Sequence, residues 1–309
     1  MMNMGSLQSE CVTVLLLFML LLAVTPFKCN AQSRIPPHDE VEAFKEIAMQ
    51  LNKYVDRHFD DPCNLPASNI EYYTNEVICD CSSSANNECH IERLDFSGQN
   101  LDGNLPSSLW KLPYLKEVFL DRNFLSGSIP PEWGSTKLER LDISVNNLSG
   151  PIPAELGNIS TLRELSMESN LFSETIPSEL GNLVNLEYLN LNANNLIGKF
   201  PLSLTNLSKL SVLKISSNYF TGRMPEFGNW KQLETLEMEA SGFSGPIPPS
   251  ISTLANLTEL RITDLNGENS LDFPDLSKMT NLSTLTMRSC NLRGNIPEYI
   301  LYLRRLDVL

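Results

Sequence analysis

The chain is poor in basic residues and in histidine. Its 309 residues include 23 Lys and Arg against 37 Asp and Glu, which gives a formal net charge of −14. This acidic balance argues against nonspecific binding to nucleic acid or anionic lipid. The three histidines, His38, His58 and His90, are too few and too scattered to form a metal cluster. We therefore expect no nucleic-acid partner, no metal and no other cofactor.

Long hydrophobic runs are also scarce, with one exception near the amino terminus. Residues 12–24 form an apolar run of thirteen residues, too short to span a bilayer but typical of a secretory signal peptide. Cys29 and Ala31 are small residues before a suitable cleavage site after Ala31. We expect residues 1–31 to be a signal peptide; a buried helix is the alternative, because residues 1–11 carry no Lys or Arg. Membrane attachment would need a segment missing from this chain.

Four cysteines lie close together, which indicates an oxidising compartment. Cys63, Cys79, Cys81 and Cys89 fall within 27 residues, and such a cluster in a secreted chain indicates two disulfides. Of the three connectivities we favour Cys63–Cys79 with Cys81–Cys89, because near neighbours such as Cys79 and Cys81 are expected to bond elsewhere. A zinc site is the alternative, which the Cys-x-Cys spacing disfavours.

A repeat occupies residues 91–309. Nine segments of the type LDISVNN recur at intervals of 23 to 25 residues, the period of leucine-rich repeats. Their first residues are Leu94, Val118, Leu141, Leu165, Leu189, Leu213, Leu236, Leu260 and Leu285. Leu309 follows at the same spacing, so we expect nine units and the start of a tenth.

Each position of the unit has a structural role. Two apolar residues spaced by one, such as Leu141 and Ile143, point to the same face of a short strand and enter the core. The Asn found five residues after the first leucine, as at Asn146, can hydrogen-bond to the backbone of adjacent turns. Gly and Pro then place turns before a brief extended segment and a 3₁₀ stretch. Stacking of these units predicts an α/β solenoid with a curved parallel sheet.

An amphipathic helix is expected before the repeats. Apolar residues recur at helical spacing from Val41 to Val55, and Asp39 is suited to be the N-cap. We assign residues 32–90 to a helical, disulfide-bonded cap that covers the apolar end of the first repeat, with peptide binding as the alternative role. No matching cap accompanies Leu309, so we expect a truncated gene model.

The unit LxxLxxLxLxxNxLSGxIPxxLGN resembles the plant-type extracellular leucine-rich repeat, and residues 138–158 match it nearly letter for letter. The segments DPCN, KLPYLKEVFLDRN, IPPEWGS, GPIPAELGNIS, LRITDLNG and RSCNLRGNIP resemble plant leucine-rich-repeat receptor-like serine/threonine kinases that carry a malectin-like domain. Over residues 38–309 this resemblance implies a receptor ectodomain, followed in complete relatives by a malectin-like domain, a transmembrane helix and a kinase. Kinase motifs such as HRD and DFG are missing from this sequence, so we assign no catalytic residue.

Ligand binding is expected on the exposed strand positions beside each pair of core residues, the concave surface that repeat proteins use for partners. Phe119 and Tyr188 are candidate aromatic anchors that face solvent. The full candidate set is Phe119, Arg140, Asp142, Glu164, Glu168, Tyr188, Asn190, Lys214, Glu237, Glu239, Arg261 and Arg288. Its acids could meet a basic ligand; a solvated face without a partner is the simpler alternative.

Five N-x-S/T sequons avoid these strand positions. They are Asn147, Asn158, Asn206, Asn256 and Asn281. A glycosylated binding module requires this placement, although an Asn-rich repeat also generates sequons by itself. We expect at least three of them to be occupied.

Two units depart from the pattern. After Leu260 the Asn position is Leu265, and residues 266–275 form either a loop that shapes the binding surface or a tolerated irregularity. Cys290 replaces the Asn of the next unit and is expected to be an unpaired core thiol.

We predict an extracellular recognition domain of a plant receptor-like serine/threonine kinase. Its partners would be an extracellular peptide, glycan or protein ligand and a co-receptor. It would lie on the outer side of the plasma membrane, or in the cell-wall space if unattached. The alternative is a freestanding secreted inhibitor resembling polygalacturonase inhibitors, which would act by blocking an enzyme.

Overall fold

The computed structural model describes residues 35–53, 61–64, 76–82, 88–267 and 271–309. The chain divides into two compact units, Met1–Ser33 and Arg34–Leu309, and every described residue belongs to the second. The predicted signal peptide therefore lies outside the described residues.

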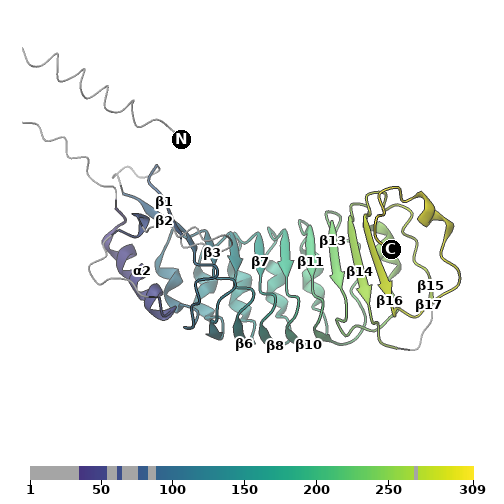
Figure 1. Cartoon of the computed structure of the whole chain (residues 1–309), viewed down its shortest axis with the longest axis horizontal. Coiled ribbons are helices and arrows are strands. Elements are labelled where there is room, and N and C mark those ends of the chain that lie inside the picture. The colour runs from purple at the N-terminus through teal and green to yellow at the C-terminus, as the bar shows by residue number, and fades with distance from the viewer. Residues whose placement is uncertain (1–34, 54–60, 65–75, 83–87, 268–270) are drawn as a thin grey trace, which may run out of the picture. The chain divides into compact units, whose positions relative to one another are not determined.

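One ten-stranded sheet runs the length of the Arg34–Leu309 unit (Figure 1). Its nine repeat strands pair in parallel in chain order, and the register aligns equivalent positions, so that Leu165 pairs with both Leu141 and Leu189. These strands are β2 (His90–Asp95), β3 (Glu117–Phe119), β5 (Arg140–Asp142), β7 (Glu164–Ser166), β9 (Tyr188–Asn190), β11 (Val212–Lys214), β13 (Thr235–Met238), β14 (Glu259–Thr263) and β16 (Thr284–Arg288). A parallel bridge between Thr284 and Val308 begins a tenth unit, so the predicted repeat is confirmed.

The second half of most units contains a shorter strand and a 3₁₀ segment, as the Gly and Pro positions predict. A parallel five-stranded sheet contains β4 (Ser126–Gly127), β6 (Asn147–Pro151), β8 (Leu171–Glu174), β10 (Asn195–Gly198) and β12 (Tyr219–Phe220). The 3₁₀ segments of the repeats are η2 (Ser107–Lys111), η3 (Pro131–Ser135), η4 (Ala154–Asn158), η5 (Ser178–Asn182), η6 (Leu202–Asn206), η7 (Pro249–Thr253) and η8 (Glu298–Tyr302). A proline immediately precedes each of them and fixes the extended backbone from which the 3₁₀ turn starts.

The core lies between these two layers, and the repeated Asn residues close its edge. Pairs such as Leu189 and Leu191 are fully buried. Asn170 donates from Nδ2 to the carbonyl oxygens of Ile143 and Met167, at 3.0 and 3.2 Å, and accepts at 3.0 Å from the amide of Leu148. The equivalent residues with the same pattern are Asn123, Asn146, Asn194 and Asn218. The predicted hydrogen bonds from these Asn residues to adjacent turns are therefore present, and we call the row that they form the Asn ladder.

Helix α2 (His38–Gln50) covers the first repeat with the buried residues Phe44 and Ile47. The rings of Phe44 and Phe96 meet edge to face, with centroids 6.4 Å apart. The prediction of Asp39 as N-cap is wrong. The helix begins after Pro37, whose restricted φ is suited to a helix start, and Asp39 lies in the first turn, where a carboxylate interacts favourably with the helix dipole.

The cysteines and strand β1 (Glu76–Asp80) complete this end of the molecule. The favoured disulfides are confirmed, Cys63–Cys79 with Cα atoms 5.7 Å apart and Cys81–Cys89 with Cα atoms 4.1 Å apart. A short 3₁₀ turn, η1 (Pro62–Asn64), carries the first cysteine. Strand β1 pairs with β2 in antiparallel orientation and extends the long sheet, a strand that the sequence did not predict.

The irregular unit near the carboxyl end forms a small sheet of its own. Strand β15 (Leu271–Asp272) pairs in parallel with β17 (Leu292–Arg293), so part of the predicted loop is ordered against the next unit. Residues 268–270 of that loop lie outside the described residues. Cys290 is a buried free thiol whose Sγ contacts the carbonyl oxygen of Ile262 at 3.1 Å, as expected. None of the helices described here combines the length and apolarity needed to cross a bilayer.

Candidate functional site

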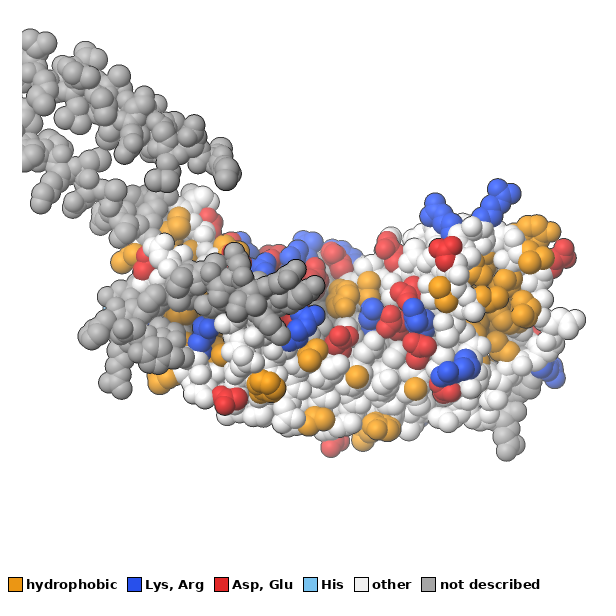
Figure 2. All heavy atoms as spheres, in the orientation of Figure 1, with side chains coloured by type: hydrophobic (Ala, Val, Ile, Leu, Met, Phe, Trp, Pro, Cys, Tyr) orange, Lys and Arg blue, Asp and Glu red, His pale blue; other side chains and the backbone are white. Residues whose placement is uncertain are grey.

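The candidate residues lie on the solvent side of the ten-stranded sheet, which we call the strand face. Parallel register places equivalent side chains in columns across the repeats, so Phe119, Asp142 and Ser166 are neighbours although 23 or 24 residues separate them in sequence. Figure 2 shows Lys and Arg side chains lying among Asp and Glu side chains over the middle of the Arg34–Leu309 unit. The face is therefore charged but not of one sign.

Each candidate cation on the strand face is already paired with an acid. Arg140 lies 3.5 Å from a carboxylate oxygen of Glu117 and 3.2 Å from one of Glu164. Lys214 lies 2.9 Å from Glu237. The remaining pairs are Arg261 with Glu259 and Arg288 with Asp264. These cations are neutralised within the protein, which makes them poor partners for an acidic ligand.

Three candidate acids have no cationic partner within the described ranges: Asp142, Glu168 and Glu239. Burial raises the pKa of the Asp142 carboxyl, and the nearby charges of Asp121 and Glu168 raise it further, against the effect of hydrogen bonds from Ser144. The Ser144 amide donates to Oδ1 of Asp142 at 2.9 Å. The unbalanced charge of this face is therefore negative, and a bound cation would relieve the repulsion.

Asp142 lies in a pocket of about 140 Å³ between two aromatic rings. Phe119 and Tyr188 line it together with Arg140, Glu164 and Ser166. The prediction that both rings face solvent is only partly right, because each is half-buried. The guanidinium of Arg93 lies 4.5 Å from the centre of the Phe119 ring, and burial raises the pKa of Tyr188. Both rings line the pocket, and the Phe119 ring is contacted by Arg93 from the preceding unit.

Asn190 contacts one residue that lines the pocket, Tyr188. It is 3% exposed, and its Nδ2 donates to Glu168 and, at 3.3 Å, to the hydroxyl of Tyr188. Asn190 is therefore placed to orient two candidate side chains more than to contact a ligand itself. Asn192, which the candidate set omitted, donates at 3.0 Å to Glu237. Its position two residues after Asn190 on the same strand face was the signal that could have found it.

The sequons lie away from the strand face, as expected. Asn147 is exposed on β6 of the five-stranded sheet, and Asn158 and Asn206 are exposed at the ends of η4 and η6. Asn256 is also exposed, whereas Asn281 is half-buried. Glycans at these positions would leave the strand face open.

The chemistry of this face is recognition by charge and shape. Within the described parts of the chain, no three His, Cys, Asp or Glu side chains are arranged to hold a metal ion. The pocket offers a carboxylate between aromatic walls, an arrangement that suits an ammonium or guanidinium group on an alkyl stem.

Comparison with known proteins agrees with the repeat fold. A family model described as "Leucine-rich repeat region" matches residues 141–272, and one described as "Leucine Rich Repeat" matches residues 90–112. A probable leucine-rich repeat receptor-like serine/threonine-protein kinase of Arabidopsis thaliana is 42% identical over 133 residues, which are 40% of this chain and 13% of that protein. A second Arabidopsis thaliana protein of this description is 41% identical over 28% of this chain and 10% of its own length.

Solved structures show the same architecture. The Arabidopsis receptor kinase HAESA, in complex with the peptide hormone IDA and the co-receptor SERK1, has a TM-score of 0.73 and 30% identity over 87% of this chain and 45% of that chain. The plant peptide hormone receptor RGFR1, in complex with RGF2, has a TM-score of 0.61 and 33% identity over 66% of this chain and 33% of that chain.

The matches concern the repeats and span only a small part of the curated relatives, 13% and 10% of the two described. The malectin-like domain implied by the sequence resemblance therefore stays a prediction. The chain contains leucine-rich repeats, and over part of its length it is similar to receptor-like serine/threonine kinases of Arabidopsis thaliana.

Proposed function

We propose that this chain is the ligand-recognition part of a plant receptor-like serine/threonine kinase and that it binds a basic, extended peptide on the strand face. The observation that carries the proposal is the pocket of Phe119, Asp142 and Tyr188, whose carboxylate has no cation of its own among the described residues. The solved structures support a peptide as the class of ligand. HAESA was solved in complex with the peptide hormone IDA, and the plant peptide hormone receptor RGFR1 was solved in complex with RGF2.

A Lys or Arg side chain, or a peptide amino terminus, fits the pocket. Its alkyl part would lie between the rings of Phe119 and Tyr188, and its charge would meet Asp142. Burial, together with the charges of Asp121 and Glu168, raises the pKa of this carboxyl, so an arriving cation would lower it again and stabilise the ionised form. Binding is therefore coupled to ionisation of Asp142.

The other unpaired acids give the peptide a direction across the repeats. Glu168 follows Asp142 by one unit, and Glu239 lies three units further on. Four strand spacings of about 4.8 Å separate the units of Asp142 and Glu239, roughly 19 Å in all, which about six residues of extended chain can cover. A peptide with several basic residues would contact all three acids.

The chain acts by binding, and its partner receptor would complete the signal. HAESA was solved with a co-receptor, and we extend this arrangement to the present chain as part of the proposal. Recognition would take place on the outer side of the plasma membrane. Kinase activity would belong to a separate segment of the complete receptor.

The test uses glycosylated, disulfide-bonded protein and three synthetic peptides of equal length that differ only in charge. Isothermal titration should show binding of the Lys- and Arg-containing peptide in preference to its Gln and Glu counterparts. Asp142→Asn and Phe119→Ala should each weaken that binding by about tenfold or more, because a partly desolvated ion pair or its aromatic wall is lost.

Phe124→Ala is the matched control, because Phe124 is an exposed aromatic outside the ten-stranded sheet. Equal binding of the basic and acidic peptides, or full binding by Asp142→Asn, would contradict the proposal. Inhibition of a purified polygalacturonase by the wild-type protein would instead support the inhibitor alternative.

A further inference from the structure

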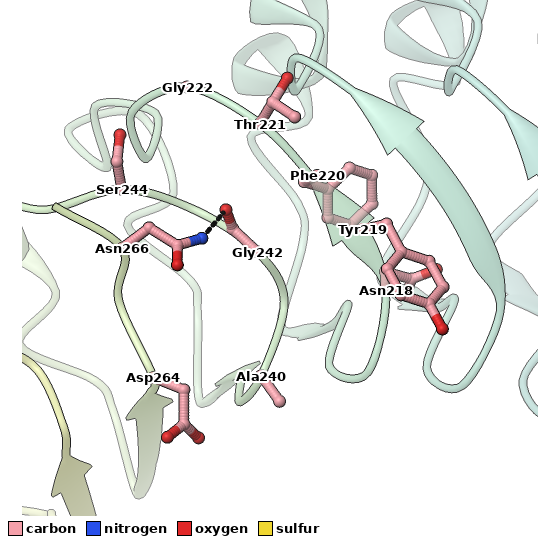
Figure 3. A pocket seen from close by; sticks show the side chains of 10 residues that line it. All are labelled: Asn218, Tyr219, Phe220, Thr221, Gly222, Ala240, Gly242, Ser244, Asp264 and Asn266. Carbon is pink, nitrogen blue, oxygen red and sulfur yellow. Dashed lines mark hydrogen bonds between the residues drawn. The ribbon is translucent and has the colours of Figure 1, made fainter.

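A second hollow lies where the chain leaves the long sheet for the shorter one (Figure 3). It has a volume of about 530 Å³, within the range of about 300–1,000 Å³ that is typical of small-molecule sites. Three successive units line it, and Tyr219, Gly242 and Asn266 occupy the equivalent position in each. We call this hollow the lateral groove.

The lateral groove exists because one side chain is missing from a column. In the five preceding units the residue after the ladder Asn has a side chain that projects from the edge: Phe124, Asn147, Leu171, Asn195 and Tyr219. The next unit has Gly242, with φ +92°, where a Cβ atom would lie 2.4 Å from the carbonyl oxygen of Phe220. Glycine is thus required at this position. Gly242 and Ala240 have little or no side chain, so the middle unit of the groove is left unfilled.

The walls of the groove stand two units apart. Figure 3 shows Tyr219 on one side of Gly242 and Asn266 on the other. Twice the spacing of neighbouring strands is roughly 10 Å, enough for a ring lying flat against an aromatic side chain. Asp264 and Asn266 come from the unit whose sequence departs from the repeat, so this irregularity forms one wall.

The polar groups of the groove are suited to hydroxyl groups. Asn266 donates from Nδ2 to the carbonyl oxygen of Gly242 at 2.8 Å, which leaves its Oδ1 as an acceptor. Thr221 and Ser244 add hydroxyls, and Asp264 adds a carboxylate. Asp264 is the one charged residue among those lining the groove, and Arg288 lies 3.6 Å from it, so the local charge is nearly balanced.

From this geometry we infer that the lateral groove binds a neutral oligosaccharide. A pyranose ring has an apolar C–H face, which packs on the 64% exposed ring of Tyr219, and peripheral hydroxyls, which pair with Asp264, Asn266, Thr221 and Ser244. A charged ligand would lose hydration in the groove without gaining an unpaired opposite charge, because Asp264 is already paired with Arg288. This site is separate from the strand face, and the inference does not depend on the proposed peptide binding.

Cellohexaose and mannohexaose are the neutral probes, and hexagalacturonate is the acidic comparison. Saturation-transfer NMR and calorimetry with the glycosylated protein should show millimolar or tighter binding of at least one neutral hexasaccharide and weaker binding of hexagalacturonate. Tyr219→Ala and Asp264→Asn should each reduce the affinity by about tenfold or more, since stacking or a hydroxyl partner is lost.

Phe124→Ala serves as the control, because Phe124 occupies the same repeat position and is also 64% exposed. It should bind the sugar as wild type does, and circular dichroism should confirm that all variants are folded. Absence of neutral-saccharide binding at millimolar concentration, preference for hexagalacturonate, or undiminished binding by Tyr219→Ala would each overturn the inference. Tyr219→Ala should leave peptide binding unchanged, so the two proposals fail independently.

Discussion

The carboxylate of Glu40 lies 2.6 Å from Nδ1 of His90 and accepts a hydrogen bond of 3.0 Å from the amide of Ile91, across 50 residues of sequence. Glu40 is only 2% exposed, and the ring of His90 stacks on Tyr114 with centroids 3.8 Å apart. One side chain thus joins the helical cap to the first strand of the repeats.

Glu40→Ala should destabilise the protein by about 2 kcal/mol, because the Ile91 amide and the His90 ring lose a buried partner. Urea unfolding followed by circular dichroism measures the loss. Glu42→Ala is the control, because its side chain is exposed and pairs with Lys45 in the same helix. A loss no larger than that of the control would show that the cap is held by its apolar residues alone.

Asn170→Ala should cost roughly 2–3 kcal/mol, since it removes a 6% exposed side chain that serves three carbonyl oxygens and one amide. Asn195→Ala, at an exposed position, should cost less than about 0.5 kcal/mol. The midpoints of urea denaturation compare the two. Similar midpoints would mean that water replaces the ladder hydrogen bonds.

Gly181→Thr should destabilise by about 1–3 kcal/mol, because a Cβ atom there would lie 2.5 Å from the carbonyl oxygen of Ser203 in the next unit. The equivalent residue one unit later is Thr205. Its side chain is tolerated because, in the described residues between η6 and η7, the next unit has no 3₁₀ segment to pack against it. Thr205→Gly should therefore have a small effect. Thermal unfolding of both variants tests the difference, and equal shifts in Tm would refute the steric explanation.

Cys290 should be unreactive in the folded protein. Burial, with a smaller contribution from Asp264, raises the pKa of its thiol from 9.0 to about 11, so at pH 8 the thiolate is about a hundredfold rarer than in an unfolded chain. Titration of the protein lacking residues 1–31 with Ellman's reagent, before and after guanidinium denaturation, measures this. Because the unfolded thiol ionises first, this group's contribution to stability should be present below pH 9.0 and fall as pH approaches about 11. Rapid reaction of the native protein would contradict the buried position.

At least three of the five sequons should carry glycans when the chain is secreted from plant cells. Asn147, Asn158, Asn206 and Asn256 are exposed, so we expect Asn281, which is half-buried, to be the least occupied. Enzymatic deglycosylation in ¹⁸O-water followed by peptide mass spectrometry gives the occupancy of each site. Predominant modification of Asn281 would be inconsistent with the exposures seen here.

The regular repeat interval explains why so much of the fold could be predicted from the sequence. Leu141, Leu165 and Leu189 recur at a fixed interval, and because each unit stacks on a copy of itself, that interval alone determines which residues pair. The interval also predicted the Asn ladder and the strand face. It could not predict β1, because residues 76–80 belong to no repeat and their pairing with β2 depends on the cap and its disulfides.

The sequence by itself determined the repeat, the disulfide-rich cap, the buried thiol of Cys290 and the columns of candidate side chains. Only the tertiary structure decided which of those side chains are free of a charged partner and therefore available to a ligand. Arg140 and Lys214 look free in sequence but are neutralised by acids from neighbouring units, whereas Asp142 is left without a cation in the described chain. The lateral groove likewise depends on Tyr219 and Asn266 standing on either side of Gly242. The physical reason is that charge pairing and shape arise between units, at distances that spacing within one unit does not determine.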